Sequence, residues 1–102
     1  MNKEQLRELL VEKYDYKNSQ VDDVVDKIMR FSPNVAAAFN KWLDTGEIDD
    51  TLVEGYTVKS IIEKKQMKVV SAYITLDWLG REPDVAKAAL NQGMFNNTLS
   101  SQ

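Results

Sequence analysis

The chain contains no histidine and no cysteine among its 102 residues. Without cysteine, no disulfide, thiol catalysis or cysteine zinc site can form, and the composition fits a reducing cytoplasm. Without histidine, the chain lacks the usual general base, the commonest transition-metal ligand and the usual switch near neutral pH. Its four glycines are scattered, so no glycine-rich phosphate loop exists either. We therefore expect no enzyme, no cofactor and no bound metal.

Long apolar runs are also missing, since none approaches the roughly 20 residues that span a bilayer. The first ten residues alternate charged and apolar side chains, unlike a signal peptide. We expect a soluble cytoplasmic protein that makes no membrane contact. The net charge of −3 is uneven, because residues 1–54 carry seven Lys and Arg against 12 Asp and Glu, whereas residues 55–102 carry six against four. This acid excess argues against a nucleic-acid partner and leaves only the second half as a candidate face for one.

Apolar residues recur at helical spacing through most of the chain, and no segment alternates with the period of two that a strand requires. Asn2, Ser19, Ser32 and Thr57 are the expected N-caps, the second of them with Asp22 in a capping box. The sequence predicts an all-α fold, a compact bundle of five to six short helices without a sheet. We expect one domain over residues 1–95 and a polar tail over 96–102. The predicted helices are about 3–13, 20–29, 33–45, 58–65, 68–79 and 83–92.

The stretch Val69–Leu79 is apolar on almost every side, with polar side chains only at Ser71, Thr75 and Asp77. A helix of this composition is typical of a position covered by other helices. The sequence therefore predicts a central buried helix over about residues 68–79. Gly80 is expected to end it, because glycine adopts the positive φ that often follows a helix.

The longest stretch without a helical pattern, residues 44–56, holds five acids and no lysine or arginine: Asp44, Glu47, Asp49, Asp50 and Glu54. It does not fit the calcium-binding loop template, because glycine is its third residue and not its sixth. We expect a solvated acidic loop that interspersed apolar residues hold to the core.

Two helix ends are similar. Trp42-Leu43 precedes Gly46, and Trp78-Leu79 precedes Gly80, at an offset of 36 residues. A duplicated helical hairpin would give this pattern, and so would chance recurrence of the residues that end helices. Both interpretations stay open at this point.

The first functional hypothesis is a non-enzymatic helical module that binds a protein, either an unidentified partner or a second copy in a homodimer. Aromatic residues at helix edges can anchor an interface, although the same residues often line a protein's own core. The segment Asn34–Gly46 is similar to the third helix of ubiquitin-associated domains, but the loop at Tyr14–Tyr16 lacks that family's glycine. The candidate partner-binding residues are Tyr14, Tyr16, Phe31 and Phe95.

The alternative is a helix-turn-helix regulator that binds nucleic acid through residues 57–79. The segment Asp77–Glu82 resembles the end of the recognition helix in some bacterial winged-helix domains. That resemblance implies a β-hairpin downstream, whereas Pro83 begins a helical pattern, and Val69 and Val70 stand where polar side chains would read bases. The residues expected to contact phosphate under this alternative are Lys59, Lys64, Lys65 and Lys68.

Overall fold

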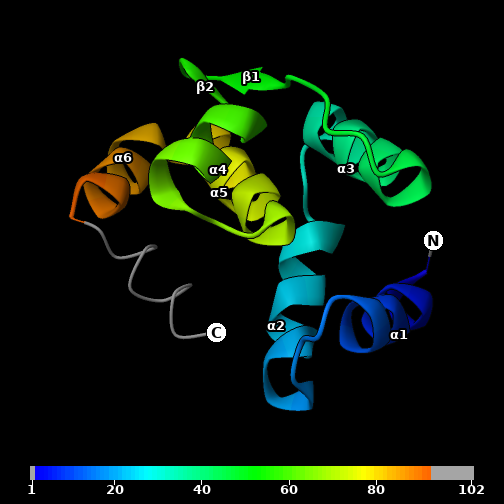
Figure 1. Cartoon of the computed structure of the whole chain (residues 1–102). Coiled ribbons are helices and arrows are strands. Elements are labelled where there is room, and N and C mark those ends of the chain that lie inside the picture. Colours follow the sequence, from blue (N-terminus) through cyan, green and yellow to red (C-terminus); the bar gives the residue numbers. More distant parts are fainter. Residues whose placement is uncertain (1, 93–102) are drawn as a thin grey trace. The chain divides into compact units, whose positions relative to one another are not determined.

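The computed structural model describes residues 2–92, and the chain divides into two compact units, Met1–Phe31 and Ser32–Gln102. The described part is mostly helical, with six α-helices, which confirms the all-α prediction (Figure 1). None of its helices combines the length and the apolar character needed to cross a bilayer. The single domain over 1–95 stays a prediction, and the predicted tail lies outside the described residues.

The first unit consists of α1 (Lys3–Lys13) and α2 (Asn18–Met29), which pack against each other. Asn2 caps α1 and forms a capping box with Gln5, as the sequence indicates. The predicted cap at Ser19 is wrong, because α2 begins at Asn18. Its expected partner Asp22 instead accepts a hydrogen bond from Arg7 Nε at 3.0 Å, so an ion pair between the helices replaces the capping box.

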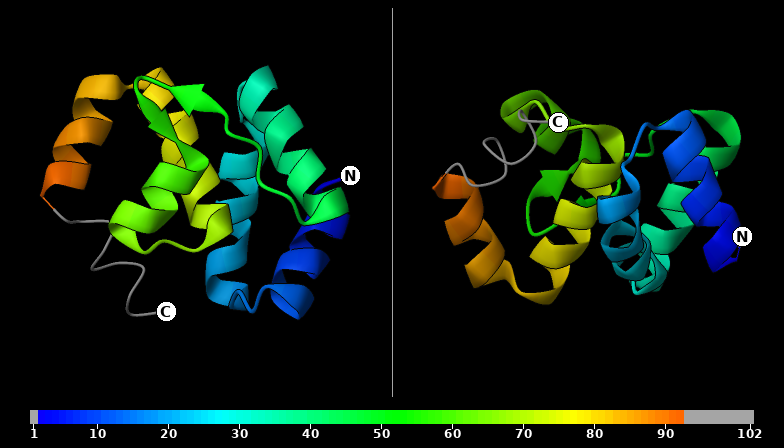
Figure 2. Two further views of the ribbon diagram at one scale, coloured as in Figure 1. Left: turned by 45° about the horizontal axis from the view of Figure 1, so that its top comes forward. Right: turned by 90° about the horizontal axis from the view of Figure 1, so that it is seen from below.

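The second unit is built around α5 (Val69–Arg81). This helix packs against α3 (Pro33–Thr45), α4 (Val58–Lys65) and α6 (Pro83–Asn91). Figures 1 and 2 show α3 and α6 on opposite sides of α5. Its buried side chains are Val70, Ala72, Tyr73, Thr75, Leu76, Asp77 and Leu79.

A small sheet makes the prediction of no sheet wrong. Strands β1 (Leu52–Val53) and β2 (Tyr56–Thr57) pair antiparallel, with Val53 opposite Tyr56. Glu54 and Gly55 form the turn with φ values of 50° and 83°, which is the backbone that a tight two-residue hairpin requires. Strands of two residues are too short to produce a readable alternation, so the pattern of the sequence could not reveal them.

The predicted end of the central helix is also wrong, because α5 continues through Gly80 to Arg81. A Cβ atom on Gly80 would lie 3.1 Å from Cγ1 of Val53, which is closer than ordinary van der Waals contact. Gly80 therefore marks the place where β1 packs against α5, and this close approach explains a glycine inside a helix.

Two apolar residues that follow the helical spacing of their segments face solvent. Met29 on α2 and Val85 on α6 are exposed, whereas their periodic neighbours Ile28 and Ala86 are buried. Each lies at the margin of its apolar stripe, where one residue of helical rotation decides between core and solvent.

Candidate functional site

A pocket of about 310 Å³ lies within the second unit, where the start of α3, strand β1 and the last turns of α5 meet. This size is at the lower end of the range for small-ligand pockets. Its walls are partly apolar and partly polar. The residues that line it are Ser32, Asn34, Val35, Leu52, Val53, Leu76, Asp77, Gly80 and Arg81.

The carboxylate of Asp77 connects two sides of this pocket. Its Oδ1 accepts a hydrogen bond from the backbone N–H of Ser32 at 2.9 Å, and its Oδ2 accepts one from Arg81 Nε at 2.8 Å. The residue is 7% exposed, whereas the Arg81 side chain is 51% exposed. Because buried polar groups need partners, these two bonds explain how a carboxylate fits into an otherwise apolar helix. Asp77 also places negative charge at the start of α3, where the helix dipole favours it.

Ser32 precedes α3 as predicted, but its side chain does not cap the helix. Its Oγ donates to Asn34 Oδ1 at 2.9 Å, and no side-chain oxygen of Ser32 accepts from the backbone of the first turn. The end of α3 is as expected, since Gly46 follows it with a φ of 77°. Because Ser32 and Asn34 both line the pocket, their polar groups form part of its wall.

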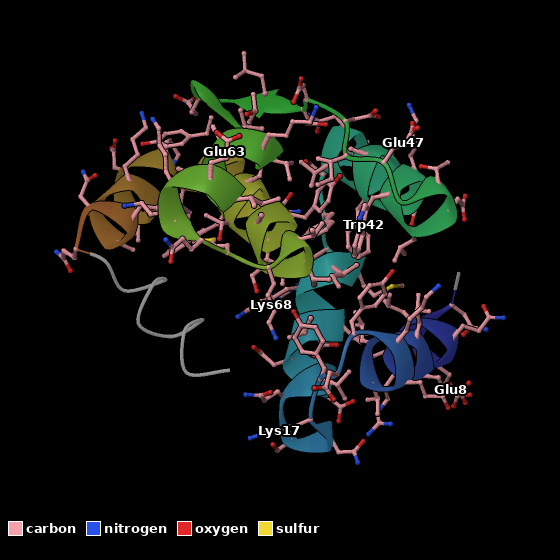
Figure 3. The ribbon with its side chains drawn as sticks, in the orientation of Figure 1. Glu8, Lys17, Trp42, Glu47, Glu63 and Lys68 are labelled. Atoms are coloured by element: carbon pink, nitrogen blue, oxygen red, sulfur yellow. The ribbon has the colours of Figure 1, made fainter. Side chains whose placement is uncertain are left out.

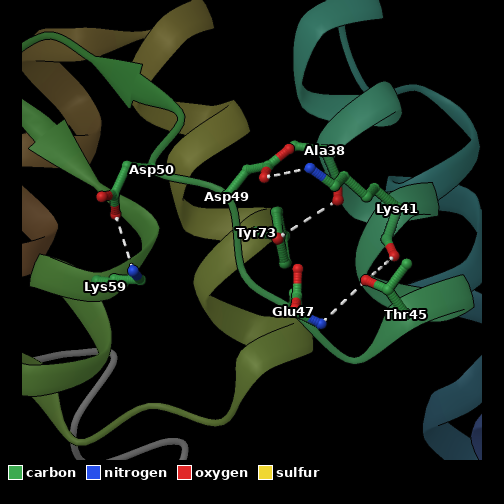
Figure 4. A network of polar contacts seen from close by, with 8 residues as sticks. All are labelled: Ala38, Lys41, Thr45, Glu47, Asp49, Asp50, Lys59 and Tyr73. Atoms are coloured by element: carbon green, nitrogen blue, oxygen red, sulfur yellow. Dashed lines mark hydrogen bonds and ion pairs between the residues drawn. The ribbon is translucent and has the colours of Figure 1, made fainter.

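An aromatic cluster supports α5 against α3. The ring centroid of Tyr73 lies 5.4 Å from that of Phe39 and 6.1 Å from that of Trp42. The Tyr73 hydroxyl donates to the carbonyl oxygen of Ala38 at 3.4 Å (Figure 4). Burial and, to a smaller extent, the negative charge of Asp49 raise the pKa of Tyr73 above 10.0. The fold therefore favours the neutral phenol.

The acidic segment is bound by lysines from outside it. Lys41 Nζ donates to Asp49 Oδ1 at 3.0 Å, which raises the pKa of Lys41 (Figure 4). Two further pairs, at 3.7 Å each, join Asp50 to Lys59 and Glu54 to Lys87. Three of the five acids therefore lie in ion pairs with α3, α4 and α6, while four of the five acids remain exposed as expected.

The edge aromatics differ in accessibility. Tyr14 and Phe31 are half-buried, and Tyr16 is only 9% exposed. All three belong to the first unit, and none is among the residues that line the pocket described above. Phe95 lies outside the described residues. The use of these residues in partner binding stays a prediction.

The four lysines of the nucleic-acid alternative have different surroundings. Lys59 is ion-paired with Asp50, and Lys65 Nζ donates to the carbonyl oxygen of Leu90 at 3.0 Å. Lys64 and Lys68 are exposed, and Lys68 precedes the first residue of α5. The same helix α4 also carries the exposed acid Glu63 (Figure 3).

No family model, curated protein or solved structure matches this chain. Within residues 2–92, no group of three or more His, Cys, Asp or Glu side chains is arranged to hold a metal ion. The walls of the pocket themselves offer apolar contact from Val35, Val53 and Leu76 and hydrogen-bond donors from Arg81 and Asn34.

Sequence reasoning missed this pocket because its residues come from three separate segments. One signal was present, since Asp77 is a charged residue in an apolar helix, and buried charge is more informative than an exposed apolar side chain.

Asp77→Ala is predicted to lower the free energy of unfolding by about 2–3 kcal/mol, because both hydrogen bonds to a buried charged acceptor are lost. Arg81→Ala is predicted to cost less than about 1 kcal/mol, since half of its side chain is in water. Urea unfolding followed by far-UV circular dichroism measures both. Asp77→Asn keeps an acceptor for the backbone N–H of Ser32, so its loss of unfolding free energy should lie between those of the other two variants. An equal loss in Arg81→Ala and Asp77→Ala would contradict the conclusion that Asp77 contributes more to stability than Arg81.

The raised pKa of Tyr73 predicts a loss of stability at alkaline pH. The folded chain holds the phenol proton more tightly than the unfolded chain, whose tyrosines titrate near pH 10. The stabilisation is complete below the ordinary value of 10.0 and is lost as the pH rises through the raised folded value. Tyr73→Phe cannot ionise and should show a smaller stability loss in urea unfolding between about pH 9 and 11.5. Tyr56→Phe, outside the aromatic cluster, serves as the control, and an unchanged slope in Tyr73→Phe would refute the prediction.

Proposed function

We propose that this protein is a non-enzymatic helical module that binds another protein through the pocket and the adjoining side chain of Leu52. The observation that carries the proposal is the position of Leu52, which is 62% exposed at the pocket. A single exposed leucine is ordinary on any protein surface. Leu52 differs because it lines a concave site, together with the partly exposed Val53 and the buried Val35 and Leu76. An interface anchor requires a concave site of this kind.

The proposed partner is a protein. In the homodimeric form of this proposal, the partner is a second copy of the chain. We place the protein in the cytoplasm, and its lack of cysteine supports that placement because nothing in it depends on an oxidising compartment. The absence of histidine supports a binding role over general acid–base catalysis.

Photo-crosslinking tests the proposal with the full chain. A photoreactive amino acid replaces Leu52 in one variant and Glu8, an exposed residue of α1, in the control. Irradiation in cells that make the protein should give a discrete adduct from position 52 and none from position 8. The adduct mass, read by mass spectrometry, separates a homodimer from another protein. Equal crosslinking at both positions, or none at position 52, would exclude this surface as the interface.

A helix-turn-helix function is the second candidate, and the three-residue connection between α4 and α5 favours it. Val70 is buried near the start of α5, however, and Lys65 binds a carbonyl oxygen of its own chain. If DNA were the partner, affinity for duplex DNA would fall steeply between about 50 and 200 mM salt and would drop further in Lys64→Glu/Lys68→Glu. We expect no such salt-dependent binding in fluorescence polarisation, with Glu8→Lys as a control for added charge elsewhere.

A further inference from the structure

Several hydrogen-bond donors at the pocket have no partner among the described residues. Both carboxylate oxygens of Asp77 are engaged, by Ser32 N and by Arg81 Nε. Arg81 makes no other hydrogen bond with the residues that the structure describes, so its Nη1 and Nη2 groups keep their donors. Asn34 Oδ1 already accepts from Ser32 Oγ, which leaves the Asn34 amide nitrogen as a further donor.

The apolar walls lie next to these donors. Val35, Leu76 and Val53 line the same pocket as Arg81. Leu52 lines it too and is 62% exposed. A volume of about 310 Å³ is too small for a helix and suits one apolar side chain with a neighbouring polar group. A carboxylate is the group that guanidinium donors bind best, because two parallel N–H bonds match its two oxygens.

The strand at the pocket indicates the conformation of the ligand. In a hairpin with a two-residue turn, Val53 and Tyr56 form the hydrogen-bonded pair. The backbone N–H and C=O of Leu52 therefore face away from β2, toward the open edge of β1. An extended chain can pair with such an edge, while its side chains enter the pocket beside it.

We propose that the pocket binds an extended internal segment of the partner protein, in which an apolar side chain fills the site and an adjacent Asp or Glu binds Arg81. This proposal rests on the proposed function and specifies the partner's chemistry. An internal segment fits better than a chain end because Leu52 offers apolar surface outside the pocket, which a segment running past would cover. The Asp77–Arg81 pair is neutral as a whole, so recognition depends on directed hydrogen bonds more than on long-range attraction.

Selection from a library of displayed internal peptides tests the proposal with the full chain. Peptides selected by the wild-type protein should be enriched in an apolar residue beside Asp or Glu. A selected peptide, made with blocked ends, should lose about 10-fold or more in affinity when its acid is changed to the matching amide. This change leaves the protein untouched, so it cannot act through misfolding.

Variants of the protein complete the test. Arg81→Gln should also lose about 10-fold or more, whereas Lys59→Gln, which removes an equal charge away from the pocket, should keep the wild-type affinity. Circular dichroism checks that Arg81→Gln is folded. Selection of basic peptides, equal binding by Arg81→Gln, or binding that needs a free terminal carboxylate would overturn the proposal, as would no enrichment at all. An adduct at position 52 with no peptide preference would retain the proposed function and reject only this inference.

Discussion

The second unit depends on the carboxylate of Asp77. It joins the backbone at the start of α3 to a side chain in the last turn of α5, through bonds of 2.9 and 2.8 Å. A buried carboxylate that loses a hydrogen-bond donor is destabilised by about 1–3 kcal/mol, so an arrangement that removed Ser32 from Asp77 would be disfavoured. The bond from Ser32 N holds the start of α3 against α5 at the pocket, whereas the bond from Arg81 lies within α5. The interaction that stabilises this part of the fold is therefore also the one that shapes the candidate site.

The acidic segment shows that the composition of a segment does not indicate which partners its charged side chains find in the folded chain. Its acids meet Lys41, Lys59 and Lys87, which belong to three different helices. Exposed ion pairs of this kind contribute about 0–1 kcal/mol each, so they add little stability. Their effect is to favour one path of the acidic segment across the surfaces of these helices. The contact of Val53 with Gly80 then brings β1 against α5, and the segment delivers a strand to the pocket.

The helices could be predicted from the sequence because their signals are local. Asn2, Pro33 and Gly46 mark helix ends that the structure confirms. The prediction that Gly80 ends the helix is wrong. In a sequence, a glycine that makes room for a neighbouring strand cannot be distinguished from a glycine that ends a helix. The pocket could not be predicted, since contacts between residues 32–35, 52–53 and 76–81 exist only after folding. Composition indicated what the protein lacks, but not where this concave mixed surface would form.

The exposure of Leu52 follows from the geometry of its strand. Successive side chains of a strand point to opposite faces, so the contact between Val53 and Gly80 on α5 turns Leu52 the other way. Position 52 is thus directed outward by the same contact that builds the pocket. Stability alone would be served there by a polar residue, because an exposed leucine gains nothing from burial. Leu52 thus leaves an apolar side chain in water beside the pocket that Arg81 also lines, and the proposed binding site is built on that combination.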